Sequence, residues 1–400
     1  MSQTFADLGI SKNVTSALSR QRVDEPFPIQ SQVIPDALAG TDVLAQSPTG
    51  SGKTLAFIAP IIDRLDQEAR RPSALVLAPT RELAAQIVDD AKPLAQARGL
   101  NAVAVFGGVG IEPQIRKARK AHLLVATPGR LLDLLDRRAL SLADVRVVVL
   151  DEADRMLDMG FRPDVERILK QTPDSRQTLL FSATLEGEVD SLAKRYTRNA
   201  RRHENPVSKA SRPDIAHRFV SVRHEDKLTA LIDELSAERD GHALVFVRTR
   251  RGADRLAKRL IGRGVNALAM HGGKSQNQRT RALAGFEQGK VDALIATDVA
   301  ARGIDVRGIT HVVNFDPPED RDAYVHRMGR TARAGRSGAG ITFVMADQAH
   351  EVGQIASALD LGHEFAAGGL GTASRAGRSS HGSGRSHARR GGRPSGRRAR

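Results

Sequence analysis

The chain has no cysteine and no tryptophan, and only two tyrosines among its 400 residues. Because cysteine is absent, disulfide frameworks and cysteine-ligated zinc or iron–sulfur sites are excluded. No apolar run approaches the roughly 20 residues that cross a bilayer. The first residues also lack the basic and apolar regions of a secretory signal. We therefore expect a soluble, cytoplasmic protein without a membrane segment.

Positive charge is in excess, and much of it lies at the C-terminal end. The chain has 61 Lys and Arg against 46 Asp and Glu, a net charge of +15. Residues 371–400 contain nine arginines and no acid, which leaves a net charge of +6 for residues 1–370. A Gly-, Ser- and Arg-rich stretch cannot bury a core, so we expect a disordered tail over 366–400. We interpret the tail as a flexible nucleic-acid tether, with a purely solubilising segment as the alternative.

The length of the chain fits two domains, and short apolar runs recur along both halves, each followed by a turn and a helical pattern. Such runs predict buried strands of parallel sheets that helices cover on both faces. They occupy 43–45, 75–78, 103–106, 123–126, 147–150 and 178–181 in the first half, and 219–222, 243–247, 267–270, 293–296, 311–315 and 341–344 in the second. The predicted fold is α/β, with two such domains in tandem.

A polar stretch without periodicity separates the two halves at 201–214 and contains Pro206 and Pro213. This composition predicts an interdomain linker. We expect an N-terminal segment over 1–33, a first domain over 34–205, a linker over 206–215 and a second domain over 216–365. Ligands of open parallel sheets bind at the carboxyl ends of the strands, which is where the Gly-rich and acidic motifs of this chain fall.

A Gly-rich loop, SPTGSGKT at 47–54, follows the first expected strand. Gly50 and Gly52 allow backbone N–H groups to turn toward phosphates, and the next helix directs its N-terminus at them. Lys53 would reach the β- and γ-phosphates of a nucleotide, and Thr54 would place its hydroxyl on Mg²⁺. Ser47 stands where the strict pattern has glycine, so a structural turn is the alternative for this loop taken alone.

A second motif, VVVLDEAD at 147–154, is an apolar strand that ends in carboxylates. Asp151 stands at the strand end, where phosphate-transfer sites hold Mg²⁺, and the adjacent Glu152 can activate a water molecule. Taken alone, these acids could simply begin a helix, whose dipole favours them. Together with the Gly-rich loop, they predict a site for nucleotide phosphates and Mg²⁺.

These motifs resemble those of the DEAD-box RNA helicase family, and further segments carry the resemblance in the family's order. They are PIQ (28–30), PTREL (79–83), GG (107–108), TPGR (127–130), SAT (182–184), VFVRT (245–249), QNQR (276–279), ATDVAARGID (296–305) and HRMGRTAR (326–333). The resemblance covers about residues 3–365 and implies two RecA-like domains that bind ATP, Mg²⁺ and RNA. A minimal core followed by a basic tail is most similar to the bacterial RhlE-type subgroup.

The resemblance also implies roles for residues of the nucleotide site. Gln30 would read the adenine edge, Asp305 would contact the ribose, and Phe5 would stack on the base unless it is a core anchor. The implied loop and metal contacts are Ser47, Pro48, Thr49, Gly50, Ser51, Gly52, Lys53, Thr54 and Asp151. The implied catalytic set is Asp151, Glu152, Lys53, Arg330 and Arg333, in which the two arginines act as fingers from the second domain.

RNA would lie across both domains, opposite the nucleotide. The implied contacts are Thr80, Arg81, Gly108, Thr127, Arg130, Thr249, Arg279 and Thr297. Arginines, Thr hydroxyls and backbone N–H groups suit phosphates and 2′-hydroxyls, so we expect recognition that is mostly independent of sequence. Ser182 and Thr184 would couple hydrolysis to RNA, although each alone could cap a strand-end turn.

The chain departs from the family pattern at a few positions. Arg22 and Ala332 stand where the family usually has glycine, and Phe27 stands where it usually has threonine. If the backbone at Ala332 needs a positive φ, the alanine is strained by roughly 1–2 kcal/mol. We expect no loss of activity, because the arginines on either side of Ala332 are retained.

The expected function is RNA-stimulated ATP hydrolysis that drives local separation of RNA strands or remodelling of ribonucleoproteins. The alternative is an ATP-gated RNA clamp whose slow hydrolysis serves only release. A DNA translocase of the same superfamily is disfavoured by the Gln30 motif and by the DEAD sequence.

Overall fold

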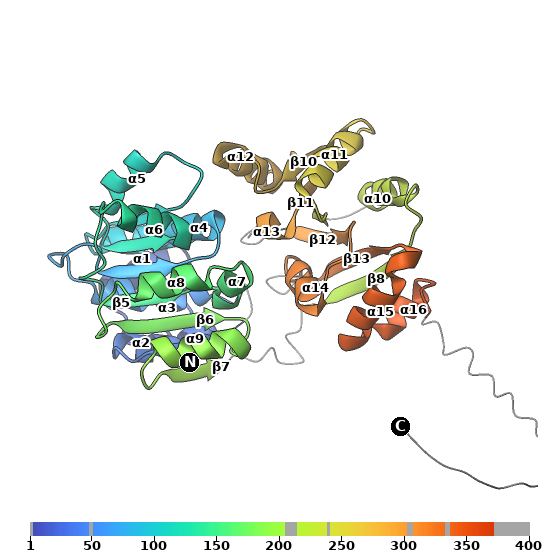
Figure 1. Ribbon diagram of the computed structural model, residues 1–400. Helices are drawn as coiled ribbons and strands as arrows, with labels where there is room; N and C mark the ends of the chain where they lie inside the picture. Colours follow the sequence, from blue (N-terminus) through green and yellow to red (C-terminus); the bar gives the residue numbers. More distant parts are fainter. Residues whose placement is uncertain are drawn as a thin grey trace, which may run out of the picture.

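The computed structural model describes residues 3–47, 51–204, 214–237, 241–301, 306, 308–332 and 337–371. Figure 1 shows two α/β units, the first formed by the blue-to-green half of the chain and the second by the yellow-to-red half. None of the described helices is long and apolar enough to cross a membrane. The expected start of the disordered tail at 366 was wrong, because Ala366 and Ala367 belong to the helix Gly362–Ala367 and Leu370 is buried in a hydrophobic core. The rest of the expected tail, from residue 372 on, lies outside the described residues.

The first unit is built on a parallel sheet with the strand order β3-β4-β2-β5-β6-β1-β7. Its strands are β1 (Val43–Gln46), β2 (Ala74–Leu77), β3 (Ala102–Val105), β4 (Leu123–Ala126), β5 (Val147–Leu150), β6 (Gln177–Ser182) and β7 (Arg201–Glu204). Its helices are α1 (Lys12–Arg20), α2 (Pro28–Leu38), α3 (Lys53–Arg64), α4 (Arg81–Ala97), α5 (Ile111–Ala118), α6 (Pro128–Asp136), α7 (Ala153–Asp158), α8 (Arg162–Leu169) and α9 (Gly187–Tyr196).

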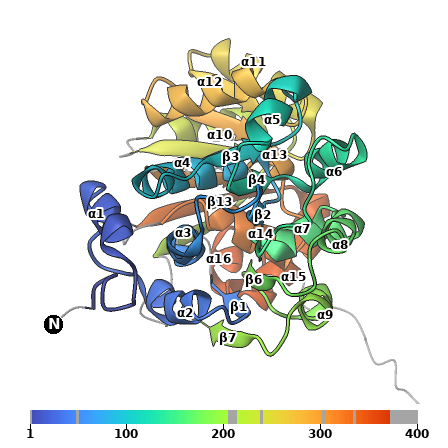
Figure 2. The same ribbon diagram turned by 90° about the vertical axis from the view of Figure 1, so that its left-hand side faces the viewer.

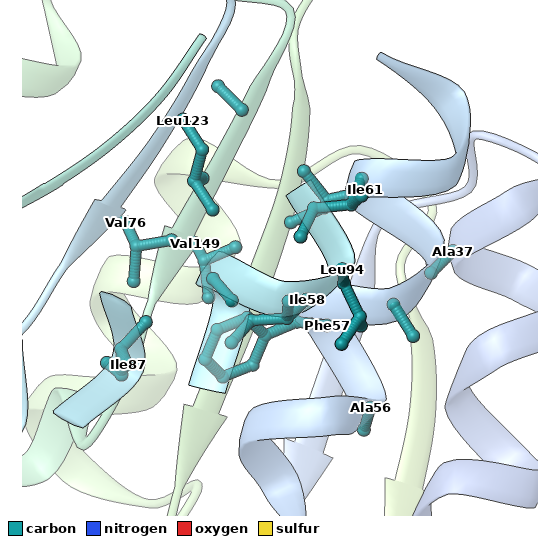
Figure 3. Close-up of a cluster of buried hydrophobic side chains, with 14 of the residues drawn as sticks. Ala37, Ala56, Phe57, Ile58, Ile61, Val76, Ile87, Leu94, Leu123 and Val149 are labelled. Carbon is teal, nitrogen blue, oxygen red and sulfur yellow. The ribbon is translucent and has the colours of Figure 1, made fainter. Parts of the chain in front are cut away.

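Helices cover both faces of this sheet, because alternate side chains of a strand point to opposite faces. In β5, Val147 and Val149 belong to the cluster packed under α1–α4, whereas Val148 and Leu150 belong to the cluster under α6–α9. Figure 2 shows these two groups of helices on opposite sides of the sheet. Figure 3 shows part of the first cluster, with Phe57 of α3 packed near Val149. Burial on both faces explains why these strands are continuous apolar runs.

The second unit repeats the plan with a parallel sheet in the order β10-β11-β9-β12-β13-β8. Its strands are β8 (Ile215–Ser221), β9 (His242–Phe246), β10 (Ala267–Met270), β11 (Ala293–Ala296), β12 (Ile309–Asn314) and β13 (Gly338–Val344). Its helices are α10 (Lys227–Ser236), α11 (Arg250–Ile261), α12 (Gln276–Glu287), α13 (Asp298–Ala301), α14 (Arg321–Met328), α15 (Ala349–Ala358) and α16 (Gly362–Ala367), with a 3₁₀ turn at Ala346–Gln348. Two buried clusters again lie on the two faces.

All twelve apolar runs overlap with strands, and the expectation of two tandem α/β domains built on parallel sheets is confirmed. The linker expected at 201–214 was partly wrong, because its first four residues form β7. This strand is polar and mostly exposed, since it lies at the edge of the sheet and pairs with β1 alone. An edge strand that packs little apolar surface gives no hydrophobic pattern to detect. At the other end, β8 begins at Ile215, directly after the polar stretch 201–214 and at the last residue of the linker range 206–215.

Long-range polar contacts hold β7 in place. The carbonyl of Asp42, just before β1, accepts a hydrogen bond from the backbone N–H of Arg201 at 2.8 Å. The carboxylate of Asp42 accepts from the N–H of Arg198 at 2.6 Å, and His203 lies 2.8 Å from the carboxylate of Asp36. These partners are more than 150 residues away in sequence, so only the folded chain reveals them.

Candidate active site

The predicted phosphate loop and acidic motif meet at one edge of the first sheet. β1 runs into Ser47 and β5 runs into Asp151, on either side of β6, which ends at Ser182. The backbone N–H of Ser47 donates to the carbonyl of Ser182 at 3.0 Å, which ties the start of the loop to the end of β6. The carboxyl ends of these parallel strands therefore lie side by side at one edge of the sheet, as the sequence predicted.

Lys53 is buried at the start of α3 and points back into its own loop. Its ammonium donates to the carbonyl of Ser47 at 2.9 Å, while the hydroxyls of Ser47 and Ser51 lie 2.5 Å apart. Lys53 and Thr54 are the first two residues of α3, so the helix N-terminus and the lysine favour bound phosphate. Pro48, Thr49 and Gly50, the remaining loop residues expected to contact the nucleotide, lie outside the described residues.

Both the backbone conformation and the close packing at position 52 require glycine. Its φ is +83°, and a Cβ at this position would stand 2.6 Å from both Gln30 Nε2 and Phe27 Cδ2. Gln30 and Phe27 therefore pack directly on Gly52 of the expected phosphate loop.

Asp151 is buried at the end of β5, and burial raises its pKa to about 7 although the charge of Lys53 acts in the opposite direction. A buried carboxylate with incomplete compensation suits a divalent cation. Among the described residues, no group of three His, Cys, Asp or Glu side chains could by itself enclose a metal. This fits Mg²⁺, which is commonly held by one or two protein ligands together with substrate phosphates and water.

Glu152 lies next to Asp151 with a left-handed backbone, φ +52° and ψ 51°, at the N-cap of α7. Its carboxylate accepts a hydrogen bond from Arg155 at 2.7 Å, and both side chains are buried. Burial alone would raise the pKa of Glu152, but the positive charges of Arg155, Lys53 and Arg330 outweigh it and lower the pKa. Glu152 is therefore a carboxylate at neutral pH, the form that accepts a proton from water.

Sequence reasoning missed Arg155. It follows Glu152 by three residues on the same short helix, and this spacing brings side chains together on a helix surface. The sequence signal that could have identified this contact is the arginine that directly follows the acidic motif.

Arg330 is buried in the second domain and contributes to the electrostatic field at Glu152 in the first. Its guanidinium Nε also donates to the carbonyl of His326 at 3.3 Å. Arg333 and Asp305, the other second-domain residues expected at the nucleotide, lie outside the described residues.

A neighbouring arginine, Arg327, has a structural role that the sequence did not reveal. Its guanidinium donates two hydrogen bonds to the carboxylate of Asp298, at 2.6 and 2.7 Å, and a third to the side-chain oxygen of Asn314 at 3.0 Å. Arg327 thereby fixes α14, the helix that leads to Arg330, against α13 and the end of β12.

On the adenine side, Gln30 is fully buried, and its amide contacts the protein backbone. Its Oε1 accepts from the N–H of Phe27 at 2.8 Å, and its Nε2 donates to the carbonyl of Gly52 at 2.8 Å. The amide oxygen can accept one further hydrogen bond, and the amide nitrogen can donate one more. The Phe27 side chain is 57% exposed, whereas Phe5 is only 2% exposed and belongs to the core. The position of Phe5 fits the core-anchor alternative and leaves no open ring face for a base.

The strand-end residues Ser182 and Thr184 differ in their surroundings. Ser182 is buried, and its hydroxyl accepts from the N–H of Asp154 at 3.3 Å, while the carboxylate of Asp154 accepts from the N–H of Ala183 at 3.1 Å. The DEAD segment and the end of β6 are thus directly linked. Thr184 is exposed and its hydroxyl accepts from the N–H of Glu186 at 3.3 Å, as in a capped turn.

A cleft of about 410 Å³ lies between the domains, and several residues expected to contact RNA line it. Those residues are Thr80, Arg81, Thr127, Arg130 and Arg279; Glu82, Gly107, Gly129, Met159, Phe161, Gly272 and Val299 line it with them. Burial together with the charges of Arg279 and Arg130 lowers the pKa of Arg81, which shows that cations gather in the cleft. Such a surface attracts phosphates.

The other three residues expected to contact RNA, Gly108, Thr249 and Thr297, are not among the residues that line this cleft. Gly108 has φ +83°, and a Cβ there would stand within 2.7 Å of the Arg81 guanidinium, so glycine makes room for that side chain. Thr249 caps α11 by accepting from the N–H of Gly252 at 3.0 Å, and Thr297 is buried behind β11. Thr80 likewise caps α4, through Leu83 at 3.2 Å.

The chain resembles known helicases over most of its length. It matches the DEAD/DEAH box helicase family over residues 27–192 and the helicase conserved C-terminal domain over 226–335. It is 42% identical to the DEAD-box ATP-dependent RNA helicase CshA of Bacillus licheniformis, over 86% of this chain and 71% of that protein. It is also 42% identical to CshA of Geobacillus kaustophilus, over 88% of this chain and 75% of that protein.

Solved structures agree. The fold is similar to S. cerevisiae Dbp5 bound to RNA and ADP BeF3, with a TM-score of 0.82 and 30% identity over 90% of this chain and 94% of the other. It is also similar to Mss116p bound to ssRNA and AMP-PNP, with a TM-score of 0.80 and 29% identity over 90% and 78% of the two chains. With its two RecA-like sheets and its motifs at their strand ends, the chain belongs to the DEAD-box family of ATP-dependent RNA helicases.

Proposed function

We propose that this protein hydrolyses ATP when RNA is bound and uses the cycle to separate short RNA duplexes or remodel ribonucleoproteins. The observation that carries the proposal is that Glu152 of the first domain lies in the electrostatic field of Arg330 of the second. A cleft lined by residues of both domains supports it. An active site divided between two domains is complete only when they close. RNA that bridges the domains would favour closure and thereby hydrolysis.

In this proposal, the first domain binds the phosphates and prepares the water. The loop N–H groups, the N-terminus of α3 and Lys53 hold the triphosphate. Thr54 and Asp151 hold Mg²⁺, which neutralises charge on the phosphate oxygens when bound. Glu152, kept ionised by Arg155, accepts the proton of the attacking water. Gln30 recognises adenine with the hydrogen-bonding positions that Phe27 and Gly52 do not use.

The second domain supplies the remaining groups. Arg330 and Arg333 stabilise the charge that develops on the transferred phosphoryl group, and Asp305 contacts the ribose. Ser182 links this chemistry to RNA through Asp154, and Thr184 supports the same turn. The eight RNA contacts of the sequence analysis bind phosphates and 2′-hydroxyls rather than base edges.

Finer assignments rest on the sequence. We keep the first domain at 34–205, the linker at 206–215 and the second domain at 216–365 as proposals, and the sequence ranges of the two sheets support them. A minimal core with a basic tail supports the RhlE-type subgroup, although the relatives described above carry the name CshA. The absence of cysteine from the sequence supports a location in a reducing compartment such as the cytoplasm.

The test measures ATP hydrolysis with and without RNA beside the separation of a short RNA duplex. We expect RNA to stimulate hydrolysis and ATP to be required for strand separation. Hydrolysis that RNA does not stimulate would contradict the proposal. Stimulated but slow hydrolysis without strand separation, together with ATP-dependent retention of RNA, would instead identify the ATP-gated clamp.

A further inference from the structure

The helix α11 and its flanks carry an unusual concentration of positive charge. Residues 248–263 contain seven Lys and Arg and a single acid, Asp254, a net charge of +6. This equals the whole net charge of residues 1–370, so the rest of the folded part is balanced.

The structure places this charge on one exposed face. The opposite side of α11 packs against the sheet through Ala253, Leu256, Ala257 and Leu260. The exposed side chains are Arg251, Arg255, Lys258 and Arg259, which we call the α11 basic face. Within the described part of the chain, none of the four forms an ion pair.

The one acid on this helix is engaged elsewhere. The carboxylate of Asp254 lies 3.0 Å from His271 Nε2 and 2.8 Å from Lys274 Nζ. The negative charge of Asp254 therefore does little to neutralise the positive charges of the arginines on this helix. Four unpaired cations within about two turns of helix repel one another, which a polyanion would relieve.

The N-terminal end of α11, just before the basic face, lies beside the cleft. α11 starts directly after Thr249, and the guanidinium of Arg250 packs on Gly272, where a Cβ would stand 3.3 Å from Arg250 Nη2. Gly272 lines the cleft between the domains. Figure 1 shows β10, the edge strand of the second sheet, between α12 and α11, which pack on opposite faces of that sheet. From its end beside Gly272, α11 therefore leads away from the cleft along the other face of the second domain.

The side chains of the α11 basic face indicate what kind of partner it binds. Residues 248–263 contain no aromatic side chain, so stacking on bases is not available, whereas Arg and Lys heads suit phosphates. The arginine-rich tail of this chain cannot be the occupant, because like charges repel. Because the N-terminal end of α11 lies beside the cleft, the favoured partner is the RNA proposed to bind there.

We propose that the α11 basic face binds the phosphate backbone of RNA that extends beyond the cleft, as a continuation of the same strand. This inference rests on the proposed function, since it requires RNA in the cleft. It predicts that long RNAs gain affinity and salt dependence from α11, whereas an oligonucleotide short enough to be covered by the cleft gains neither.

The experiment compares two full-length variants with equal changes in net charge. One carries Arg251→Glu, Arg255→Glu and Arg259→Glu; the control carries Lys12→Glu, Arg70→Glu and Lys170→Glu, which reverse exposed charges on the first domain. RNA affinity is measured against salt for the short oligonucleotide and for the same sequence extended on its 5′ or 3′ side. A third variant with glutamine at 251, 255 and 259 guards against misfolding caused by the reversed charges.

We expect the α11 variant to reduce the salt slope for one extended RNA by about 2, since three phosphate contacts contribute about 0.7 each on a single strand. The short oligonucleotide should bind as it does to the control, and the glutamine variant should show the same pattern. Equal affinity of the α11 and control variants for both extended RNAs would overturn the inference. An acidic protein would then be the remaining kind of partner for this face. Equal losses for short and extended RNA would also overturn it, by making α11 part of the cleft. If the wild-type chain bound no RNA at all, the proposed function itself would fail.

Discussion

Arg279 on α12 of the second domain donates its Nε–H to the carboxylate of Glu82 on α4 of the first domain, at 2.8 Å. Both side chains are 7% exposed, and Gln276 donates to the same carboxylate at 3.3 Å. The sequence analysis assigned Arg279 to RNA alone. In the structure it also joins the domains at the wall of the cleft.

Reversing this pair should show whether it supports closure. Arg279→Glu places two carboxylates face to face, and breaking a buried pair costs about 3–5 kcal/mol. We expect the single variant to lose most RNA-stimulated ATPase activity while it still binds nucleotide. The double variant Glu82→Arg with Arg279→Glu should recover part of the lost rate, because the attraction is restored with opposite polarity. If the double variant were no better than the single one, Arg279 would act through RNA only.

Glu152→Gln should abolish turnover and leave ATP and RNA binding in place. The amide keeps the size of the side chain but cannot accept a proton from water. We expect hydrolysis to fall by at least about 10²-fold, measured as phosphate release at saturating ATP and RNA.

Lys53→Ala is the comparison, and nucleotide binding should weaken with it, because Lys53 holds the phosphates. Turnover at the normal rate in Glu152→Gln would remove Glu152 from the role of base.

Mg²⁺ binding to the nucleotide-free protein should weaken with acid from neutral pH downward. Burial raises the pKa of Asp151 to about 7 in the metal-free protein, so protons compete with the cation below that pH and cease to compete above it. We expect the affinity to fall by up to about tenfold for each pH unit below 7. Calorimetric titration from acidic to weakly basic pH measures this slope, and Asp151→Asn should abolish it. A wild-type slope that begins only near pH 4 would show that Asp151 keeps its ordinary pKa.

Ala332→Gly and Arg22→Gly should each stabilise the fold. Their φ angles are +53° and +60°, in the left-handed region that costs an ordinary residue about 1–2 kcal/mol. The greater freedom of glycine in the unfolded chain cancels part of this, which leaves a gain of roughly 1 kcal/mol or less. Thermal unfolding should shift upward by up to about 2–4 °C for each change. Ala230→Gly in α10 is the matched control and should lower the midpoint, since its helical backbone gains nothing from glycine.

Deleting residues 371–400 should weaken RNA binding without slowing catalysis. The nine arginines bind phosphates without fixed geometry, and each phosphate they neutralise steepens the salt dependence by about 0.7 on single strands. The truncated protein should need more RNA for half-maximal ATPase activity and should show a flatter salt slope, at nearly the same maximal rate. An unchanged affinity and slope would leave the tail as a solubilising segment.

Much of the architecture follows from the sequence alone. Runs such as VVVL at 147–150 are apolar at every position, because β5 is buried on both faces, so they can be found without a structure. The acidic and Gly-rich motifs come directly after such runs, and the ends of parallel strands meet at one edge. Local order along the chain was therefore enough to place Asp151, Glu152 and Lys53 together.

The tertiary structure decided what local order cannot encode. The pairing of Glu82 with Arg279 joins residues 197 positions apart, and Asp42 fixes Arg198 from 156 positions away. The burial of Phe5 and the exposure of Phe27 depend on which helices pack against them, not on the two rings, which are chemically identical. The sequence determined which strands form and where their polar ends meet, because those are short-range consequences of burial and chain direction. Contacts between distant helices and between domains were settled only when the whole chain had packed.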